Sequence, residues 1–119
     1  MTNVLLVDDN REGADAVTAL LKASDHTVHC AYSVREALDL LDEGREIDIV
    51  VSDIRMPDVD GFDFLRVLRH RFPKLPIVLI TGQPLTRDDF VPKDAVIVLK
   101  PFSISQLQQA IAERMSVSR

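Results

Sequence analysis

Short hydrophobic runs alternate along the chain with longer stretches in which hydrophobic residues recur every three or four positions. Short runs rich in Val, Ile and Leu are typical of strands buried on both faces of a parallel sheet. Four runs have this composition, and a fifth, Thr27–Ala31, is more polar and fits an edge strand. The four predicted buried strands are Val4–Val7, Ile47–Val51, Ile77–Ile80 and Ala95–Leu99.

The intervening stretches have the hydrophobic spacing of amphipathic helices. Two of them begin with the spacing of a capping box, in which Ser33 precedes Glu36 and Ser103 precedes Gln106. Pro73 ends the third helical pattern, because proline cannot continue a helix. The predicted buried stripes are Ala14, Val17 and Leu21; Val34, Leu38 and Leu41; Leu65, Leu68 and Phe72; and Ile104, Leu107, Ile111 and Met115.

Strands and helices therefore alternate, which predicts an α/β fold with a five-stranded parallel sheet covered by helices on both faces. Because Thr27–Ala31 fits an edge, the expected strand order is 2-1-3-4-5, the flavodoxin-like form of the doubly wound fold. One connection departs from the pattern. Pro84 and Pro92 bracket a short window before the fifth strand, so we expect a shortened or irregular fourth helix there, or a loop.

The length of 119 residues suits one domain, 1–119, and the hydrophobic content of 46% is enough for a core. We expect the last helix to end near Arg114, with residues 116–119 as a frayed tail or the start of a linker. The net charge of −5 disfavours a broad nucleic-acid interface. The single Cys30 excludes an internal disulfide, and the first residues lack the features of a signal peptide. No hydrophobic run is long enough to cross a membrane, so we expect a cytoplasmic protein.

Polar residues follow the predicted strands at the edge where open parallel sheets bind ligands. Asp8 and Asp9 follow the first strand, and Asp53 follows the third. Thr81 follows the fourth strand, and Lys100 follows the fifth. Because the strand order reverses between the first and third strands, we expect these side chains to converge on one crevice. The sequence thus predicts three carboxylates, a hydroxyl and an ammonium in a single site.

Three neighbouring carboxylates repel one another, and a divalent cation is the simplest way to keep them ionised. Oxygen ligands on short loops suit Mg²⁺, whereas no cluster of Cys and His offers a zinc site. With Lys100 and Thr81 nearby, the site suits a phosphoryl group, whose transfer depends on positioning and charge neutralisation. One carboxylate could then act as a nucleophile and form an aspartyl phosphate.

Through the residues that follow its predicted strands, the sequence resembles a response regulator receiver domain of two-component signalling. The resemblance covers nearly the whole chain, from about Asn3 to Arg114. Each matching segment is short, and the specificity comes from all four occurring in order at the ends of the correct strands. The segments are VDDN (Val7–Asn10), SDIRMPDVDGFDFL (Ser52–Leu65), ITG (Ile80–Gly82) and LKPF (Leu99–Phe102).

The resemblance implies a magnesium-dependent phosphoacceptor site. Asp53 would be the phosphoacceptor, taking a phosphoryl group from a histidine kinase or a phosphotransfer domain. Asp8 and Asp9 would hold Mg²⁺ together with Asp53. The backbone carbonyl of Arg55 would be a further ligand. Lys100 would contact the oxygens of the incoming phosphoryl group.

Further residues would adjust the response. Thr81 would move towards the phosphate, and the bond before Pro101 is expected to be cis. Ile97 occupies a position that usually holds an aromatic switch residue, so this switch is in question. The interval between the fourth strand and the lysine is also shorter than in typical members, which points to an altered output surface.

Two positions are expected to influence the lifetime of the phosphate. Arg55 and Gln83 flank the path of the hydrolytic water in the family, and we hypothesise that Arg55 changes the dephosphorylation rate through its bulk and charge. Gly82, next to Gln83, is a further modulating position. No separate substrate is expected, so the chain is not predicted to be an enzyme beyond catalysing its own phosphorylation and dephosphorylation. An output domain, linked or separate, and a homodimer are compatible with the family, and no nucleic-acid-binding element is present.

Alternatives exist for single residues and for the whole chain. Asp8 and Asp9 could cap the first helix, Thr81 could be a turn residue, and Lys100 could be a surface lysine. The chain as a whole could be a pseudo-receiver that binds partners without phosphate, which Ile97 and the shortened fourth helix favour. A hydrolase of the haloacid-dehalogenase type is disfavoured, because it requires a D-x-D motif after the first strand.

Overall fold

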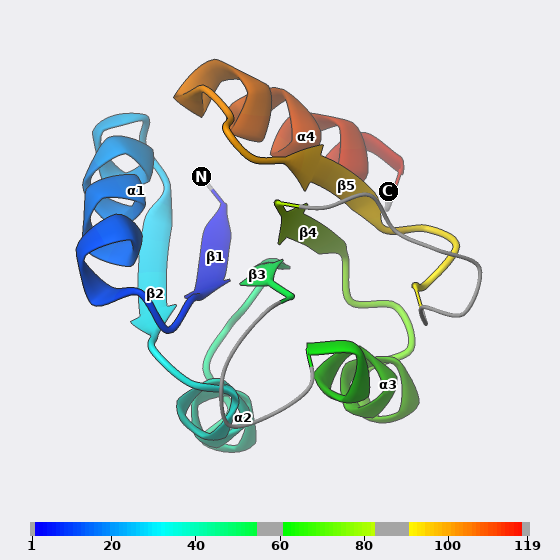
Figure 1. Ribbon diagram of the computed structural model, residues 1–119. Helices are drawn as coiled ribbons and strands as arrows, with labels where there is room; N and C mark the ends of the chain where they lie inside the picture. Colours follow the sequence, from blue (N-terminus) through cyan, green and yellow to red (C-terminus); the bar gives the residue numbers. More distant parts are fainter. Residues whose placement is uncertain (1, 55–60, 83–90, 118–119) are drawn as a thin grey trace.

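The fold is described from a computed structural model, which describes residues 2–54, 61–82 and 91–117 (Figure 1). Strands and helices alternate through most of the chain, as the hydrophobic pattern predicts. The strands are β1 (Asn3–Val7), β2 (Thr27–Ala31), β3 (Ile49–Asp53), β4 (Ile77–Thr81) and β5 (Val96–Leu99). The helices are α1 (Arg11–Ala23), α2 (Val34–Asp42), α3 (Gly61–Arg71) and α4 (Ile104–Val117).

The five strands form one parallel sheet in the order β2-β1-β3-β4-β5, so the predicted fold and strand order are confirmed. Helices α1 and α4 cover one face of the sheet, and α2 and α3 cover the other (Figure 1). Alternate residues of the central strands therefore enter two separate cores. Leu6 of β1 packs in the core beneath α1 and α4, whereas its neighbour Leu5 packs in the core beneath α2 and α3.

The ends of the helices follow from side-chain caps. Asn10 precedes α1, and its side-chain oxygen accepts a hydrogen bond from the N–H of Gly13. Before α4, Ser103 and Gln106 form the predicted reciprocal capping box, with bonds of 2.8 and 3.1 Å. Helix α4 continues to Val117, beyond the predicted end near Arg114. No described helix is long and apolar enough to span a membrane.

Strands β1 and β5 begin one residue from their predicted starts, and β3 and β4 end later than predicted, which places polar residues inside the sheet. Strand β3 begins at Ile49 and extends to Asp53, and β4 extends to Thr81. The backbone ladder continues here because the N–H of Ile54 still donates to the carbonyl of Ile80. Hydrophobicity marks where a strand is apolar, whereas the hydrogen-bond ladder decides where it ends.

Strand β5 is not buried on both faces, in contrast to the prediction. Val98 is buried, but Ile97 and Leu99 are 42% and 55% exposed. The reason is that β5 lies at the edge of the sheet, and these two side chains share the face opposite α4. The predicted short fourth helix falls within 83–90, outside the described residues, and the described part of the connection between β4 and β5 contains no helix.

Candidate functional site

Three carboxylates meet at the carboxyl ends of the two central strands. Asp8 and Asp9 directly follow β1, and Asp53 is the last residue of β3. One carboxylate oxygen from each residue lies within 4.8 Å of the others. Asp53 is buried with 6% exposure, whereas Asp9 is exposed. The fold therefore brings together the three carboxylates that the sequence predicts to converge.

The loop between β1 and α1 holds Asp8 in place from both sides. The N–H of Asp8 donates to the carbonyl of Ala31 at the end of β2, over 3.1 Å. The side chain of Asp8 accepts a hydrogen bond of 3.0 Å from the N–H of Asn10. Because Asn10 is the cap of α1, neither Asp8 nor Asp9 has that task. Both carboxylates are thus available to the crevice.

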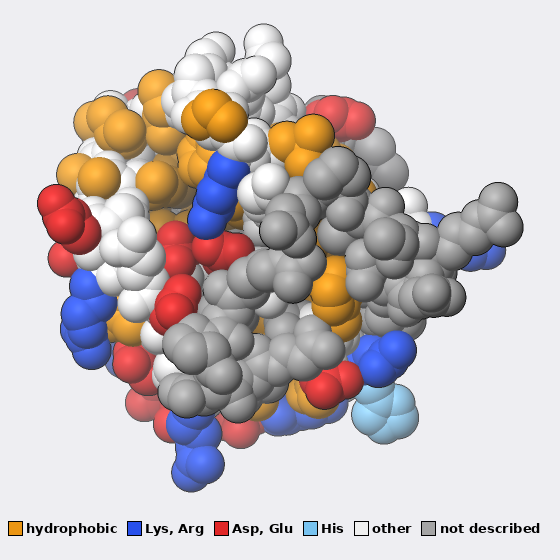
Figure 2. Space-filling model, in the orientation of Figure 1, with side chains coloured by type: hydrophobic (Ala, Val, Ile, Leu, Met, Phe, Trp, Pro, Cys, Tyr) orange, Lys and Arg blue, Asp and Glu red, His pale blue; other side chains and the backbone are white. Residues whose placement is uncertain are grey.

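Lys100 extends from the end of β5 into the same cluster. Its Nζ lies 2.6 Å from Oδ2 of Asp53, and its N–H donates to the carbonyl of Thr81 over 2.8 Å. The peptide bond between Lys100 and Pro101 is cis, as the resemblance implies. Figure 2 shows carboxylate side chains gathered beside a basic side chain in a hollow of this face. The site therefore contains three carboxylates and one ammonium.

The environment shifts the protonation of two of these groups. Burial raises the pKa of Asp8, and the nearby charge of Asp53 raises it further, against the opposing hydrogen bond from Asn10. Burial by itself would lower the pKa of Lys100, but the hydrogen bond and the charge of Asp53 outweigh burial, and the pKa of the ammonium is raised. The raised pKa of Asp8 therefore comes first from burial and then from its carboxylate neighbours, whereas that of Lys100 comes from the carboxylates around it.

A divalent cation of the hard type fits this donor set. The three acidic side chains offer only oxygen atoms, and together they carry more negative charge than Lys100 balances. Carboxylate oxygens on short loops are the ligands that Mg²⁺ takes in proteins, usually together with several waters. The chemistry of these residues is therefore compatible with the predicted Mg²⁺.

The remaining predicted residues lie around this cluster or outside the described part of the chain. Thr81 ends β4 and is almost completely buried, and Gly82 after it is exposed with open space on its side-chain side. Ile97 is exposed on β5. Arg55 and Gln83 fall outside the described residues.

One group beside the site was not predicted. Tyr32 directly follows β2, its ring lies under the guanidinium of Arg11 at 4.1 Å, and its hydroxyl donates to Asp15 over 2.5 Å. The signal was available in the sequence, because Tyr32 follows an edge strand as Asp8 follows a central one. The sequence predicts ligands only after the four hydrophobic strands, whereas Tyr32 follows the more polar strand β2.

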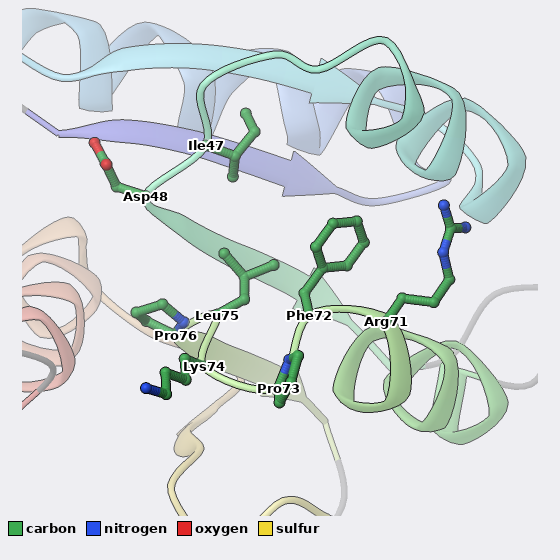
Figure 3. A pocket seen from close by; sticks show the side chains of 8 residues that line it. All are labelled: Ile47, Asp48, Arg71, Phe72, Pro73, Lys74, Leu75 and Pro76. Carbon is green, nitrogen blue, oxygen red and sulfur yellow. The ribbon is translucent and has the colours of Figure 1, made fainter.

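A separate groove of about 570 Å³ lies at the opposite end of the sheet (Figure 3). It lies between the beginning of β3 and the segment that joins α3 to β4. Its walls are mainly apolar, and no carboxylate of the acidic cluster lines it. The lining residues are Ile47, Asp48, Arg71, Phe72, Pro73, Lys74, Leu75 and Pro76.

Comparisons with known proteins agree with this arrangement. The family described as response regulator receiver domain matches residues 4–112. Sensor kinase CckA of Brucella abortus is 38% identical over 118 residues, a match that covers 94% of this chain and 12% of the kinase. This chain therefore spans about an eighth of the length of that relative.

Two solved structures share the fold. A response regulator receiver protein from Sinorhizobium medicae has a TM-score of 0.87 at 30% identity, covering 99% of this chain and 97% of that chain. The response regulator TrrA from Thermotoga maritima, solved in complex with Mg²⁺ and BeF, has a TM-score of 0.85 at 24% identity, covering 96% of this chain and 99% of that chain. Because the family match extends over most of the sequence, this chain belongs to the response regulator receiver domains of two-component signalling.

Proposed function

We propose that this receiver domain accepts a phosphoryl group on Asp53 in a reaction that requires Mg²⁺. The observation that supports the proposal is the buried carboxylate of Asp53, which lies within 4.8 Å of the carboxylates of Asp8 and Asp9 and 2.6 Å from the ammonium of Lys100. An isolated loop aspartate has no need of such surroundings. A nucleophile for phosphoryl transfer needs them, because negative charge accumulates around the phosphorus atom.

Mg²⁺ would be held by Asp8, Asp9 and Asp53, with the backbone carbonyl of Arg55 as a further ligand, and would neutralise charge on the phosphoryl group. A carboxylate oxygen of Asp53 attacks the phosphorus of a phosphohistidine. A P–O bond forms while the P–N bond breaks, and the departing imidazole keeps the electron pair and takes up a proton. Lys100 then transfers its hydrogen bond from the carboxylate to a phosphoryl oxygen.

Water then cleaves the acyl phosphate, releases inorganic phosphate and returns Asp53 to its unphosphorylated state. We propose that Thr81 senses the phosphate through its hydroxyl, and that Arg55 and Gln83 modulate the access of water. No described atom lies within 4 Å of where a side chain at Gly82 would begin, and we propose that this position also influences the lifetime of the phosphate. We further propose that residues 1–119 form one receiver domain and that the donor is a histidine kinase or a phosphotransfer domain.

Incubation with acetyl phosphate and Mg²⁺, followed by mass spectrometry of the intact protein, tests this function. The wild-type chain should gain the mass of one phosphoryl group, and it should lose that gain when Mg²⁺ is chelated. The variant Asp53→Asn removes the nucleophile and should gain nothing. Glu46→Gln, which changes an exposed carboxylate remote from the cluster, is the matched control and should be phosphorylated like the wild type.

A pseudo-receiver that binds partners without phosphate is the second candidate. The exposed side chains of Ile97 and Leu99 favour it, because they offer an apolar surface to a partner. An unchanged mass of the wild-type protein in the same experiment would support this candidate over phosphoryl transfer.

A further inference from the structure

Arg11 is held beside the acidic cluster by an aromatic contact. Its guanidinium carbon lies 4.1 Å from the centre of the Tyr32 ring. Arg11 is the first residue of α1, two positions after Asp9, and Tyr32 follows Ala31, whose carbonyl binds the N–H of Asp8. The backbone of both residues therefore lies close to the two aspartates that follow β1.

The position of Arg11 is unfavourable for the helix that it begins. The N-terminus of a helix carries partial positive charge, so a cation in the first turn lowers its stability. Arg35, in the first turn of α2, is in the same situation but has a carboxylate partner, Asp39, at 3.6 Å. Arg11 forms no ion pair within the described part of the chain. A cation that weakens its own helix and forms no ion pair among the described residues keeps its charge available for an anionic ligand.

Tyr32 is itself fixed by its neighbours. Its hydroxyl donates to Asp15 over 2.5 Å, and this bond raises the pKa of Tyr32 to about 12, so the phenol stays protonated and keeps donating. The guanidinium carbon of Arg11 lies over this ring. The cation–π contact restricts where the Arg11 guanidinium can lie, and no described residue accepts a hydrogen bond from it, so its N–H donors are available to an oxyanion.

We propose that Arg11, oriented by Tyr32, recognises the anionic phosphoryl donor at the mouth of the site. The inference rests on the proposed function. The crevice itself carries three carboxylates and one ammonium. Its net negative charge would repel an approaching phosphate until a cation neutralises the carboxylates. Arg11 places a positive charge outside the metal-binding residues. It contacts the donor as the donor approaches, and this contact ends once the phosphoryl group has been transferred to Asp53. Tyr32 acts as a positioning residue for Arg11.

The rate of phosphorylation by acetyl phosphate at saturating Mg²⁺ tests this assignment. Arg11→Gln should lower the second-order rate constant by about three- to tenfold at low salt, a difference that added salt should reduce. Arg35→Gln removes the same charge from an exposed arginine (87% side-chain exposure) of α2 and is the control. Tyr32→Ala should slow the reaction as Arg11→Gln does, and Tyr32→Phe, which keeps the ring, should restore the rate.

The outcomes separate this inference from the function on which it rests. If the wild-type chain gains no phosphoryl mass, both the phosphoacceptor function and the role of Arg11 are wrong. If the wild type is phosphorylated and Arg11→Gln reacts at the rate of Arg35→Gln, the recognition role is wrong while the phosphoacceptor function stands. A slower reaction of Arg11→Gln that does not depend on salt also contradicts the role, because loss of a steering charge must respond to ionic strength. The rate of dephosphorylation, which involves no donor, should be the same in all these variants.

Discussion

Asp8 lies half-buried beside two other carboxylates, and the surroundings penalise its ionised form. An acid whose pKa is raised by folding binds more protons in the folded than in the unfolded state over the pH range between the two pKa values. The stability of the fold therefore falls as pH rises from the unfolded value near 3.8 through the raised folded value. Above that range, the ionised carboxylate of Asp8 destabilises the protein unless a cation is bound.

Replacing Asp8 by asparagine should therefore stabilise the protein when divalent cations are absent. We expect Asp8→Asn to raise the free energy of unfolding at pH 7 on the order of 1 kcal/mol, as judged by urea denaturation in the presence of a chelator. The gain should disappear at pH values below 3.8, where the carboxyl group is protonated in both states. With Mg²⁺ added, the wild type should become more stable and Asp8→Asn should not. Equal stability of Asp8→Asn and the control Glu46→Gln in the chelator would contradict this account.

At the scale of elements, β5 is a short edge strand whose two ends are tied down by ion pairs. Lys100 binds Asp53 after the strand, and Asp94 binds two arginines before it. Arg69 of α3 donates to Asp94 over 3.1 Å, and Arg114 of α4 donates to it over 2.6 Å. Asp94 thus joins a helix of one layer to a helix of the other around the edge of the sheet.

The Arg114 side of this link is buried. Arg114 is 5% exposed, and its Nε and Nη1 have no hydrogen-bond partner among the described residues. Among the described residues, Asp94 is therefore the only carboxylate that forms an ion pair with the buried guanidinium of Arg114. Removing the carboxylate of Asp94 leaves the buried cation of Arg114 without a counter-charge. This lowers the stability of the fold even where the intact ion pair adds little to it.

We expect Asp94→Asn to lower the free energy of unfolding by about 2–3 kcal/mol. Asp63→Asn breaks an exposed pair with Arg66 of α3 and should cost less than about 0.5 kcal/mol, which makes it the control. Adding Arg114→Met to Asp94→Asn should recover most of the loss, since the uncompensated charge is then gone. A double variant as unstable as Asp94→Asn in urea denaturation would show that burial of Arg114 is not the cause.

At the scale of the whole molecule, the sequence predicts which acidic side chains converge better than it predicts where the strands begin and end. The predicted end of β3 was two residues early, yet Asp53 was assigned to the crevice correctly. The reason is that all carboxyl ends of a parallel sheet lie at one edge, so the residues after each hydrophobic run converge even when a boundary is misplaced. Helix caps were predictable because they depend on local patterns, and the strand order was predictable because alternating strands and helices with one polar edge strand leave few topologies open.

Features that depend on contacts between distant elements were not predictable. The exposure of Ile97 follows from what covers the edge of the sheet, and the hydrophobic run itself carries no such information. Neither the stacking of Arg11 on Tyr32 nor the link through Asp94 has a pattern in the sequence, because each joins residues on different elements. These contacts are specified only when the layers of the fold are assembled.

The place of Tyr32 also gives the protein a built-in optical probe. The chain has one tyrosine and no tryptophan, so its tyrosine emission comes from a single ring, which directly follows β2 and contacts Arg11. A phenol that is bonded to a carboxylate emits weakly, because the excited phenol transfers its proton readily. Binding of a cation near Asp9, or of an anion to Arg11, should change the intensity of this emission. Titration with Mg²⁺ should therefore change the fluorescence at 1:1 stoichiometry in the wild type and not in Asp8→Asn, and binding can be followed without any attached label.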